Sequence, residues 1–368
     1  MPTIEAVDLF WGVGGLTHGL RMAGISVVAG VDVDPACRFP FEANHPGAKF
    51  LLQDVANVTG TSLSELWSPN AIRLLAGCAP CQPFSSYARS KPRDHSKWGM
   101  LFHFARLIRE AHPQLVTMEN VPGLVREAPF DEFLEALREG GYHVTYEVIN
   151  VADFGVPQHR RRLVLVASRH GPINLPPRTH PGAEQWVTVK AAVGALPKLA
   201  DGEIDPHDPL HKAARLSPLN KARIQASIPG GTWRDWPPDL VAECHRRESG
   251  KHSSGVYGRM TWDQTAPTMT TLCYGFGNGR FGHPEQDRAI SLREAAIFQS
   301  FPTDYQFAPA DKPIPMKRVS KLIGNAVPPK LGEAVGKVLA RHCVDTFDRL
   351  YSPQPTPKRR SNTRPPRA

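Results

Sequence analysis

The stretch DLFWGVGGLTHGL, residues 8–20, decides the fold of this chain. It joins the end of an aliphatic run to a turn that contains Gly12, Gly14 and Gly15, and then to a pattern that begins a helix. Glycines at such a turn let a ligand approach the backbone at the N-terminus of the helix. The G-x-G-G spacing differs from the G-x-G-x-x-G of dinucleotide-binding turns, which disfavours a nicotinamide oxidoreductase.

Other aliphatic runs follow the same plan as the run that enters this turn. They lack alternation, as expected for strands buried on both faces of a sheet. The runs are IEAVDLF (4–10), ISVVAGVDV (25–33), IRLLAGC (72–78), QLVTMEN (114–120) and RRLVLVAS (161–168). Helical patterns alternate with them at residues 16–24, 36–45 and 101–112. We therefore predict an α/β fold with a doubly wound, mostly parallel sheet, which binds ligands at the carboxyl ends of its strands.

The composition changes near residue 171, where proline, glycine and tryptophan become frequent and little hydrophobic periodicity remains. We expect a catalytic domain over 1–170 and a smaller, loop-rich domain over 171–288. Residues 289–350 are expected to return to the first domain, with a long helix that opens at Pro328 and Pro329. The segment 351–368 is rich in proline and arginine and is expected to be a disordered basic tail.

The bulk properties are those of an ordinary globular protein with a basic bias. The 368 residues are 41% hydrophobic and 21% charged, and the net charge of +9 favours a polyanionic partner. The last 16 residues supply five basic residues and no acid, so charge by itself is weak evidence for nucleic acid. We find no membrane-length apolar run and no secretory signal at the N-terminus, and therefore expect a cytoplasmic protein without disulfides.

Acidic residues follow two of the predicted strands at the edge where a ligand would bind. Asp32 and Asp34 stand in GVDVDP (30–35), and Asp54 follows LLQ one strand later. A carboxylate at this position can accept hydrogen bonds from a ribose diol. A single acid there is more often a helix cap, so the assignment depends on the whole set of residues.

The stretch GCAPCQPFSS, residues 77–86, contains two cysteines in a C-x-x-C spacing. Zinc would need further ligands, and the sequence has no second C-x-x-C or C-x-x-H pair, so we expect no metal site. A thioredoxin-like pair would open a helix, whereas Pro83 follows here. We therefore interpret Cys81 as a single reactive thiol on a loop, and Cys78 as a packed residue at the strand end.

Two later stretches place charged side chains near the same edge. Glu119 ends the run VTME, and Arg160 and Arg162 stand in QHRRRLVLV after Gln158. Alternation along a strand would turn both arginines to one face. A solvated strand edge is the common explanation when such a run of arginines stands alone.

Six motifs occur together, and their order resembles the DNA (cytosine-5) methyltransferase family, of the prokaryotic restriction-modification type. They are F-x-G-x-G-G (10–15), G-x-x-P-C-Q-P-F-S (77–85), E-N-V (119–121), Q-x-R-x-R (158–162), R-E-x-x-x-x-Q-S-F-P (293–302) and G-N-A-V-P-P (324–329). The resemblance covers the chain except for the loop-rich segment and the tail. It implies a Rossmann-like S-adenosyl-L-methionine-dependent domain with an inserted target-recognition domain.

The resemblance also implies roles for individual residues. The catalytic residues would be Cys81, Glu119, Arg160 and Arg162. The cofactor would contact Phe10, Gly12, Gly14, Gly15, Asp32, Asp54, Pro80, Asn325 and Val327. DNA would contact Gln82, Ser85 and Gln158, with Tyr257, Arg259 and Thr268 as candidates in the recognition loops. The aromatic residues among these loops would equally serve as the core of the small domain.

The implied reaction is methylation of carbon 5 of cytosine through a covalent Cys81 adduct on a flipped-out base. We expect a monomer that acts on double-stranded DNA, with a companion restriction endonuclease as a possible partner. An RNA cytosine-5 methyltransferase is the nearest alternative, although its C-F-T tripeptide is missing from residues 171–290. A catalytically silent DNA-binding relative is disfavoured because Cys81, Glu119 and Arg162 are all present.

Overall fold

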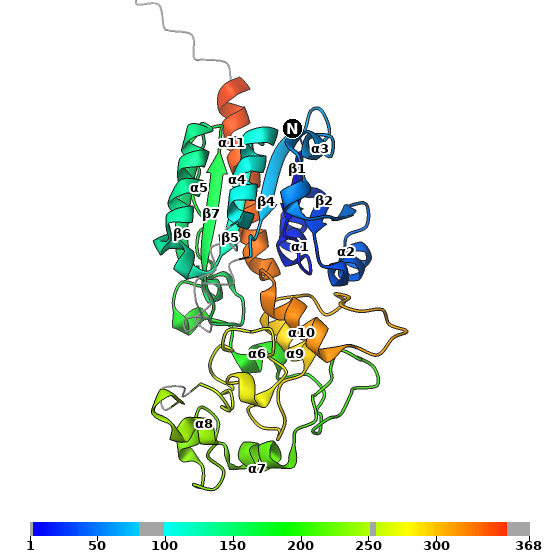
Figure 1. The fold of residues 1–368 in the computed structure, drawn as a ribbon, viewed down its shortest axis with the longest axis vertical. Helices are drawn as coiled ribbons and strands as arrows, with labels where there is room; N and C mark the ends of the chain where they lie inside the picture. Colours follow the sequence, from blue (N-terminus) through cyan, green and yellow to red (C-terminus); the bar gives the residue numbers. More distant parts are fainter. Residues whose placement is uncertain (1–2, 81–98, 251–254, 352–368) are drawn as a thin grey trace, which may run out of the picture.

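The computed structural model describes residues 3–80, 99–250 and 255–351 (Figure 1). Expectations for Cys81, Gln82, Ser85 and the basic tail lie outside these residues. A seven-stranded sheet has the order β3-β2-β1-β4-β5-β7-β6. Its strands are β1 (Ile4–Leu9), β2 (Ser26–Asp32), β3 (Lys49–Leu52), β4 (Ile72–Gly77), β5 (Leu115–Asn120), β6 (His143–Asn150) and β7 (Arg161–Ser168).

The sheet confirms the predicted α/β class. Strands β3, β2, β1, β4 and β5 pair in parallel, and β7 runs antiparallel to both β5 and β6. The five aliphatic runs of the sequence are all strands. The pattern does not predict β6, because this edge strand is largely exposed or half-buried along its length and carries no continuous apolar run.

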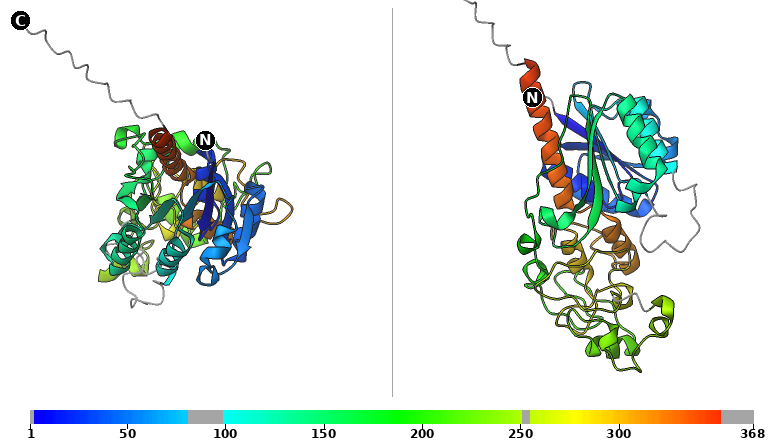
Figure 2. Two further views of the ribbon diagram at one scale, coloured as in Figure 1. Left: turned by 90° about the horizontal axis from the view of Figure 1, so that it is seen from above. Right: turned by 90° about the vertical axis from the view of Figure 1, so that its left-hand side faces the viewer.

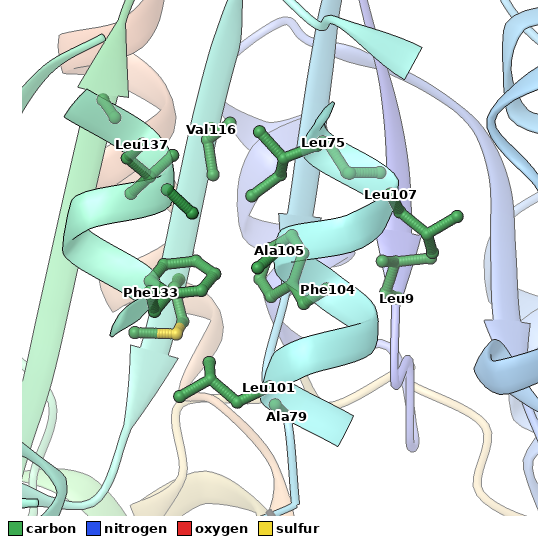
Figure 3. Packing of buried hydrophobic residues seen from close by; sticks show 14 of the residues in the cluster. Leu9, Leu75, Ala79, Leu101, Phe104, Ala105, Leu107, Val116, Phe133 and Leu137 are labelled. Atoms are coloured by element: carbon green, nitrogen blue, oxygen red, sulfur yellow. The ribbon is translucent and has the colours of Figure 1, made fainter. Parts of the chain in front are cut away.

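Helices cover both faces of the sheet (Figure 2). They are α1 (Gly15–Met22), α2 (Arg38–Asn44), α3 (Gly60–Ser64), α4 (Gly99–Ala111), α5 (Ala128–Glu139) and α11 (Pro329–Tyr351). On one face α4 and α5 bring Phe104 and Phe133 against Leu75 and Val116 (Figure 3). On the other face α1 packs along α11, which begins at the predicted Pro329. Burial of apolar surface on both faces fixes the sheet and leaves its carboxyl edge free for a site.

Beyond that edge lies a loop-rich region with short helices (Figure 1). Its helices are α6 (Val189–Val193), α7 (Pro218–Ala226), α8 (Glu243–Arg246), α9 (Leu292–Phe298) and α10 (Met316–Asn325). One core cluster joins residues of α6, α9 and α10 with Met260 and Phe281. The same cluster includes Val13 and Cys37, so α9 and α10 share a core with residues of the first 170 as well, and α11 packs on the sheet. The domain bounds that the sequence suggests stay a prediction. In the part of the chain that the structure describes, no helix has both the length and the apolar character to span a membrane.

Candidate active site

The turn after β1 is tied to the turn after β2 by a carboxylate. The backbone N–H of Gly12 donates to Asp32 Oδ2 over 2.7 Å, and the N–H of Asp34 donates to Asp32 Oδ1 over 2.8 Å. Burial raises the pKa of Asp32, and these two backbone hydrogen bonds oppose that rise. Asp32 thus lies at the glycine-rich turn, where the sequence analysis places it, and holds the turn in shape.

Open space adjoins this turn. Gly12 has φ +60°, and a Cβ built on it would meet no atom within 4 Å. Val33 and Leu52, at the ends of β2 and β3, are 68% and 46% exposed, and Leu52 is the sheet partner of Asp32. Phe10 is half-buried and its ring centroid lies 6.5 Å from that of Phe104. The edge therefore offers apolar walls, a carboxylate and free space together.

The remaining residues predicted for the cofactor have different surroundings. Asp54 is exposed and its Oδ1 accepts a hydrogen bond from Ala56 N over 2.9 Å, so it caps a short 3-10 helix. Asn325 ends α10 and is exposed. A Cβ on Gly15 would lie 2.1 Å from the carbonyl oxygen of Val327, so only glycine lets α1 begin against this segment. Val327 and Gly15 are thus in contact across more than 300 residues of sequence.

Glu119 and Arg162 form an ion pair at the same edge of the sheet. Arg162 Nε lies 2.8 Å from Glu119 Oε1, and the two side chains are only 14% and 11% exposed. β5 and β7 are adjacent and antiparallel, which brings the end of one beside the start of the other. Burial lowers the pKa of Arg162, and the charge of Glu119 opposes this shift. The pair therefore sits in a largely dry environment where electrostatic interactions are strong.

The end of β4 is held next to this pair. Asn120 Nδ2 donates to the carbonyl oxygen of Ala79 over 3.0 Å, and Asn120 Oδ1 accepts from Val121 N over 2.8 Å. Pro80 follows Ala79 and is exposed. Asn120 belongs to the E-N-V motif, but the sequence alone indicates no role for it. Its position directly after Glu119 is the signal that identifies it.

Cys78 packs at the strand end, as the sequence analysis expects. It is half-buried against the core between the sheet, α1 and α11. Burial, and then the negative charges of Glu119 and Asp8, raise the pKa of Cys78 well above its ordinary value. This thiol is therefore held protonated and is a poor nucleophile.

Two residues predicted for catalysis or DNA binding are instead buried in hydrogen-bond networks. Arg160 is 3% exposed, and its guanidinium donates to the carbonyl oxygens of Met269, Gly324 and Ala326. Gln158 is fully buried, and its side-chain amide is bonded to the backbones of Phe298 and Met269 and to the side chain of Gln299. This placement is against a direct contact of either side chain with DNA or a base, because both Nη atoms of Arg160 and the side-chain amide of Gln158 already have protein partners.

Two of the three DNA-contact candidates in the recognition loops, Tyr257 and Arg259, also contact other protein groups. Arg259 is 5% exposed and donates to the carbonyl oxygens of Ile224, His283 and Gln286, and it also pairs with Asp287. Tyr257 contacts an aromatic cluster that includes Trp236, His245 and Phe276. These two side chains build the small core, which is the alternative that the sequence left open. Thr268 is half-buried and its hydroxyl donates to His159 O over 2.8 Å.

Within residues 3–80, 99–250 and 255–351, no group of three or more histidine, cysteine or acidic side chains is arranged to hold a metal ion.

Comparison with known proteins places the whole chain among related sequences. The sequence model of the family described as C-5 cytosine-specific DNA methylase matches residues 4–341. The Type II methylase M.HgiDII of Herpetosiphon aurantiacus is 49% identical over 346 residues, which are 93% of this chain and 97% of that protein. The Type II methyltransferase M.PspPI of Psychrobacter sp. is 31% identical over 91% of this chain and 78% of its own. A solved structure described as a DNA modification methyltransferase encoded within an E. coli prophage has a TM-score of 0.70 at 22% identity, and the match covers 92% of this chain and 99% of that one.

Proposed function

The chain belongs to the C-5 cytosine-specific DNA methylases, and from this premise we propose that it methylates carbon 5 of cytosine within a short sequence of duplex DNA, with S-adenosyl-L-methionine as the donor. The observation that carries the proposal is the Glu119–Arg162 ion pair. It lies beside the Ala79–Pro80 segment that leads directly to Cys81.

The residues around Gly12 fit the proposed cofactor. A side chain at Gly12 would fill the open space next to Asp32, and glycine keeps that space available. Asp32 would accept hydrogen bonds from the ribose hydroxyls, while Phe10, Val33 and Leu52 offer apolar surface to an adenine ring. Asp54 is exposed one strand away and is our candidate for the adenine amine. S-adenosyl-L-methionine supplies an electrophilic methyl group on a positively charged sulfur.

Cys81 is proposed as the nucleophile. Carbon 5 of cytosine is a poor nucleophile because the ring is aromatic and electron-poor. When the Cys81 thiolate forms a bond to carbon 6, the ring loses its aromaticity and carbon 5 becomes enamine-like, which divides a hard step into two easier ones. Carbon 5 then takes the methyl group. A base then removes the proton of carbon 5 as the bond between carbon 6 and the Cys81 sulfur breaks, which restores the aromatic ring and releases Cys81 as the thiolate.

Glu119 and Arg162 are proposed to recognise and activate the base. Negative charge builds at nitrogen 3 as the thiolate adds, and Glu119 would hold a proton there while accepting from the exocyclic amine. Arg162 would donate to oxygen 2, and its positive charge would favour the thiolate of Cys81. In the free protein the two side chains neutralise each other in a largely dry site. An entering cytosine would thus meet groups whose charges are already paired and oriented.

The base must leave the duplex to reach these residues, because carbon 6 is inaccessible within a stacked helix. Flipping costs a few kcal/mol, which contacts of the loop-rich region with DNA must offset. We further propose that the enzyme acts as a monomer, and that it protects DNA against a companion endonuclease with the same target. The Type II relatives support this last point.

Transfer of a labelled methyl group from S-adenosyl-L-methionine to unmethylated genomic DNA tests the proposal. We expect label at carbon 5 in one recurring short sequence when the product is mapped by a bisulfite-type method. Cys81→Ser should abolish transfer and preserve cofactor binding, whereas Cys78→Ala, the matched control three residues earlier, should remain active. Transfer to RNA in place of DNA would contradict the proposed substrate, and an active Cys81→Ser enzyme would contradict the nucleophile.

A further inference from the structure

A polar hollow of ≈ 220 Å³ lies in the loop-rich region, on the side that adjoins the start of β7. Besides the buried Met260, the hollow is lined by Gly230, Thr261, Gln264, Thr265, Pro267 and Arg280. The residues come from three separate loops, so the hollow exists only in the folded protein.

Two polar side chains of this hollow have no hydrogen-bond partner among the described residues, and a third has no carboxylate partner there. The Gln264 side chain is exposed and makes no hydrogen bond within the described residues. The hydroxyl of Thr261 is buried and likewise has no partner there. Arg280 Nη1 donates to Gly231 O over 2.7 Å and to Arg259 O over 3.3 Å, but its guanidinium pairs with no carboxylate of the described chain. Buried polar groups are normally satisfied, so the buried Thr261 hydroxyl indicates a place for a polar ligand, which the exposed Gln264 side chain could also reach.

The polar hollow is rigidly connected to the proposed base-binding residues. Ala266, between two residues of the hollow, donates to Pro157 O over 3.1 Å and accepts from His159 N over 2.8 Å. Pro157 is five residues before Arg162, and five extended residues span roughly 17 Å at most. Base pairs are spaced by about 3.4 Å along DNA, so this chain span covers about five base-pair steps. The segment that carries the hollow is therefore attached to the chain close to the proposed base-binding residues, on the length scale of a short recognition sequence.

The chemistry of the polar hollow fits base edges better than phosphates. Arginine donates in a fork to guanine O6 and N7, and glutamine pairs with adenine N6 and N7. Arg280 is the one charged side chain among the described residues that line the hollow, whereas phosphate contacts usually draw on several cations or backbone N–H groups. Ile228, 57% exposed at the adjoining loop, offers apolar contact to a thymine methyl group.

We propose that the polar hollow reads the edges of base pairs next to the target cytosine, with Gln264 and Arg280 as specificity-determining residues. This inference rests on the proposed function, since it requires a DNA substrate. Tyr257 and Arg259, whose side chains are buried in the small core, are thereby replaced as candidates by Gln264, five residues after Arg259, and by Arg280, which donates to the Arg259 carbonyl oxygen.

The test compares variants on a set of duplexes in which each base pair of the mapped target is replaced in turn. The readout is the ratio of kcat/KM on the intact target to kcat/KM on each altered duplex. Gln264→Ala and Arg280→Lys should each lower this ratio about tenfold at one base pair, because a lost bidentate contact costs that much discrimination. Arg280→Lys keeps the charge and removes only the planar fork. Gln185→Ala, an exposed glutamine outside the hollow, should retain the wild-type ratio at every position.

Each other outcome overturns the inference in a recognisable way. Unchanged ratios in both variants would mean that the hollow reads no base. A uniform loss of kcat/KM on all duplexes, with constant ratios, would assign the residues to phosphate contact or to folding. If Arg280→Lys folds poorly, Gln264→Ala still tests the inference, because the Gln264 side chain is exposed and its removal should leave the fold intact. Wild-type protein that methylates no cytosine in DNA would instead defeat the proposed function itself, and the inference with it.

Discussion

The side-chain amide of Asn120 donates a hydrogen bond to the carbonyl oxygen of Ala79 over 3.0 Å, and it thereby fastens the end of β5 to the end of β4. Ala79 is two residues before Cys81, and Asn120 directly follows Glu119. One buried amide thus fixes the spacing between the segment that leads to the proposed nucleophile and the proposed proton donor. Misplacement of a reacting group by 1 Å can cost a hundredfold in rate, so this bond has catalytic consequences.

Asn120→Ala should lower kcat at least tenfold while the KM for S-adenosyl-L-methionine stays near the wild-type value. The hydrogen-bond partners of the Asn120 amide are Ala79 and Val121, so the amide sets the position of Ala79 and of the adjoining Pro80. Single-turnover methyl transfer with saturating cofactor measures the effect, and Asn57→Ala, exposed beside β3, is the control. An unchanged rate in a folded Asn120→Ala protein would mean that the bond only contributes stability.

Gly12→Ala should weaken cofactor binding about tenfold, because the methyl group would enter the open space beside Asp32. Gly24→Ala is a matched control at the far end of α1. Both glycines have positive φ and neither Cβ would meet an atom within 4 Å, so both variants should lose a similar roughly 1 kcal/mol of stability. Isothermal titration calorimetry with S-adenosyl-L-methionine measures the affinity of each variant, and we expect only Gly12→Ala to bind more weakly. Equal affinities for the two variants would place the cofactor elsewhere.

Glu119→Gln should reduce the rate of methyl transfer by about 10²-fold to 10⁴-fold, since glutamine keeps the shape of the side chain but cannot supply a proton to nitrogen 3. The expected change in melting temperature is small, because the amide oxygen can still accept from Arg162. Glu139→Gln, at the exposed end of α5, should behave as wild type. Near-normal turnover of Glu119→Gln would refute the proton-donor role.

Arg160→Met should destabilise the protein by about 3 kcal/mol, because three buried backbone carbonyls lose their donors at roughly 1 kcal/mol each. The bonds join the start of β7 to Met269 and to the end of α10, so the loss should loosen the loop-rich region against the sheet. Urea denaturation of the wild type and the variant measures the difference. Unaltered stability would return Arg160 to the list of candidate base contacts.

Asp8→Asn should stabilise the protein more at pH 7.5 than at pH 4.5. Burial raises the pKa of Asp8 from 3.8 to about 7, against the hydrogen bond from Thr17. Between these two values the unfolded chain loses a proton that the folded protein keeps. The free energy of unfolding therefore falls by about 1.4 kcal/mol per pH unit from this group as the pH rises through that window. Denaturation at both pH values provides the comparison, and a pH-independent difference would contradict the assignment.

Local sequence is sufficient to predict the strands that are buried on both faces, because continuous aliphatic runs leave them no other arrangement. The glycine-rich turn can also be predicted, since three glycines within four residues favour a turn, and Gly12 and Gly14 do have positive φ. The half-exposed edge strand β6 carries no such pattern and escapes prediction.

The different positions of the two arginines in Q-x-R-x-R could not be predicted from the sequence. Alternation predicts one face for both, but β7 begins at Arg161, so Arg160 precedes the strand and its period-two rule. Arg162 reaches Glu119 on the neighbouring strand, while Arg160 turns to carbonyl groups 109 and 164 residues away.

The sequence by itself determined the family, the sheet and the residues available for chemistry, because apolar runs, glycine turns and ordered motifs are properties of neighbouring residues. Only the tertiary structure decided which polar side chains are free to act. The sequence shows that a side chain is polar but not whether other protein groups already bind it. Arg160, Gln158 and Arg259 are buried and hydrogen-bonded within the protein, whereas the side chain of Gln264 is exposed. The partners that decide this come from distant segments, and folding alone brings them together.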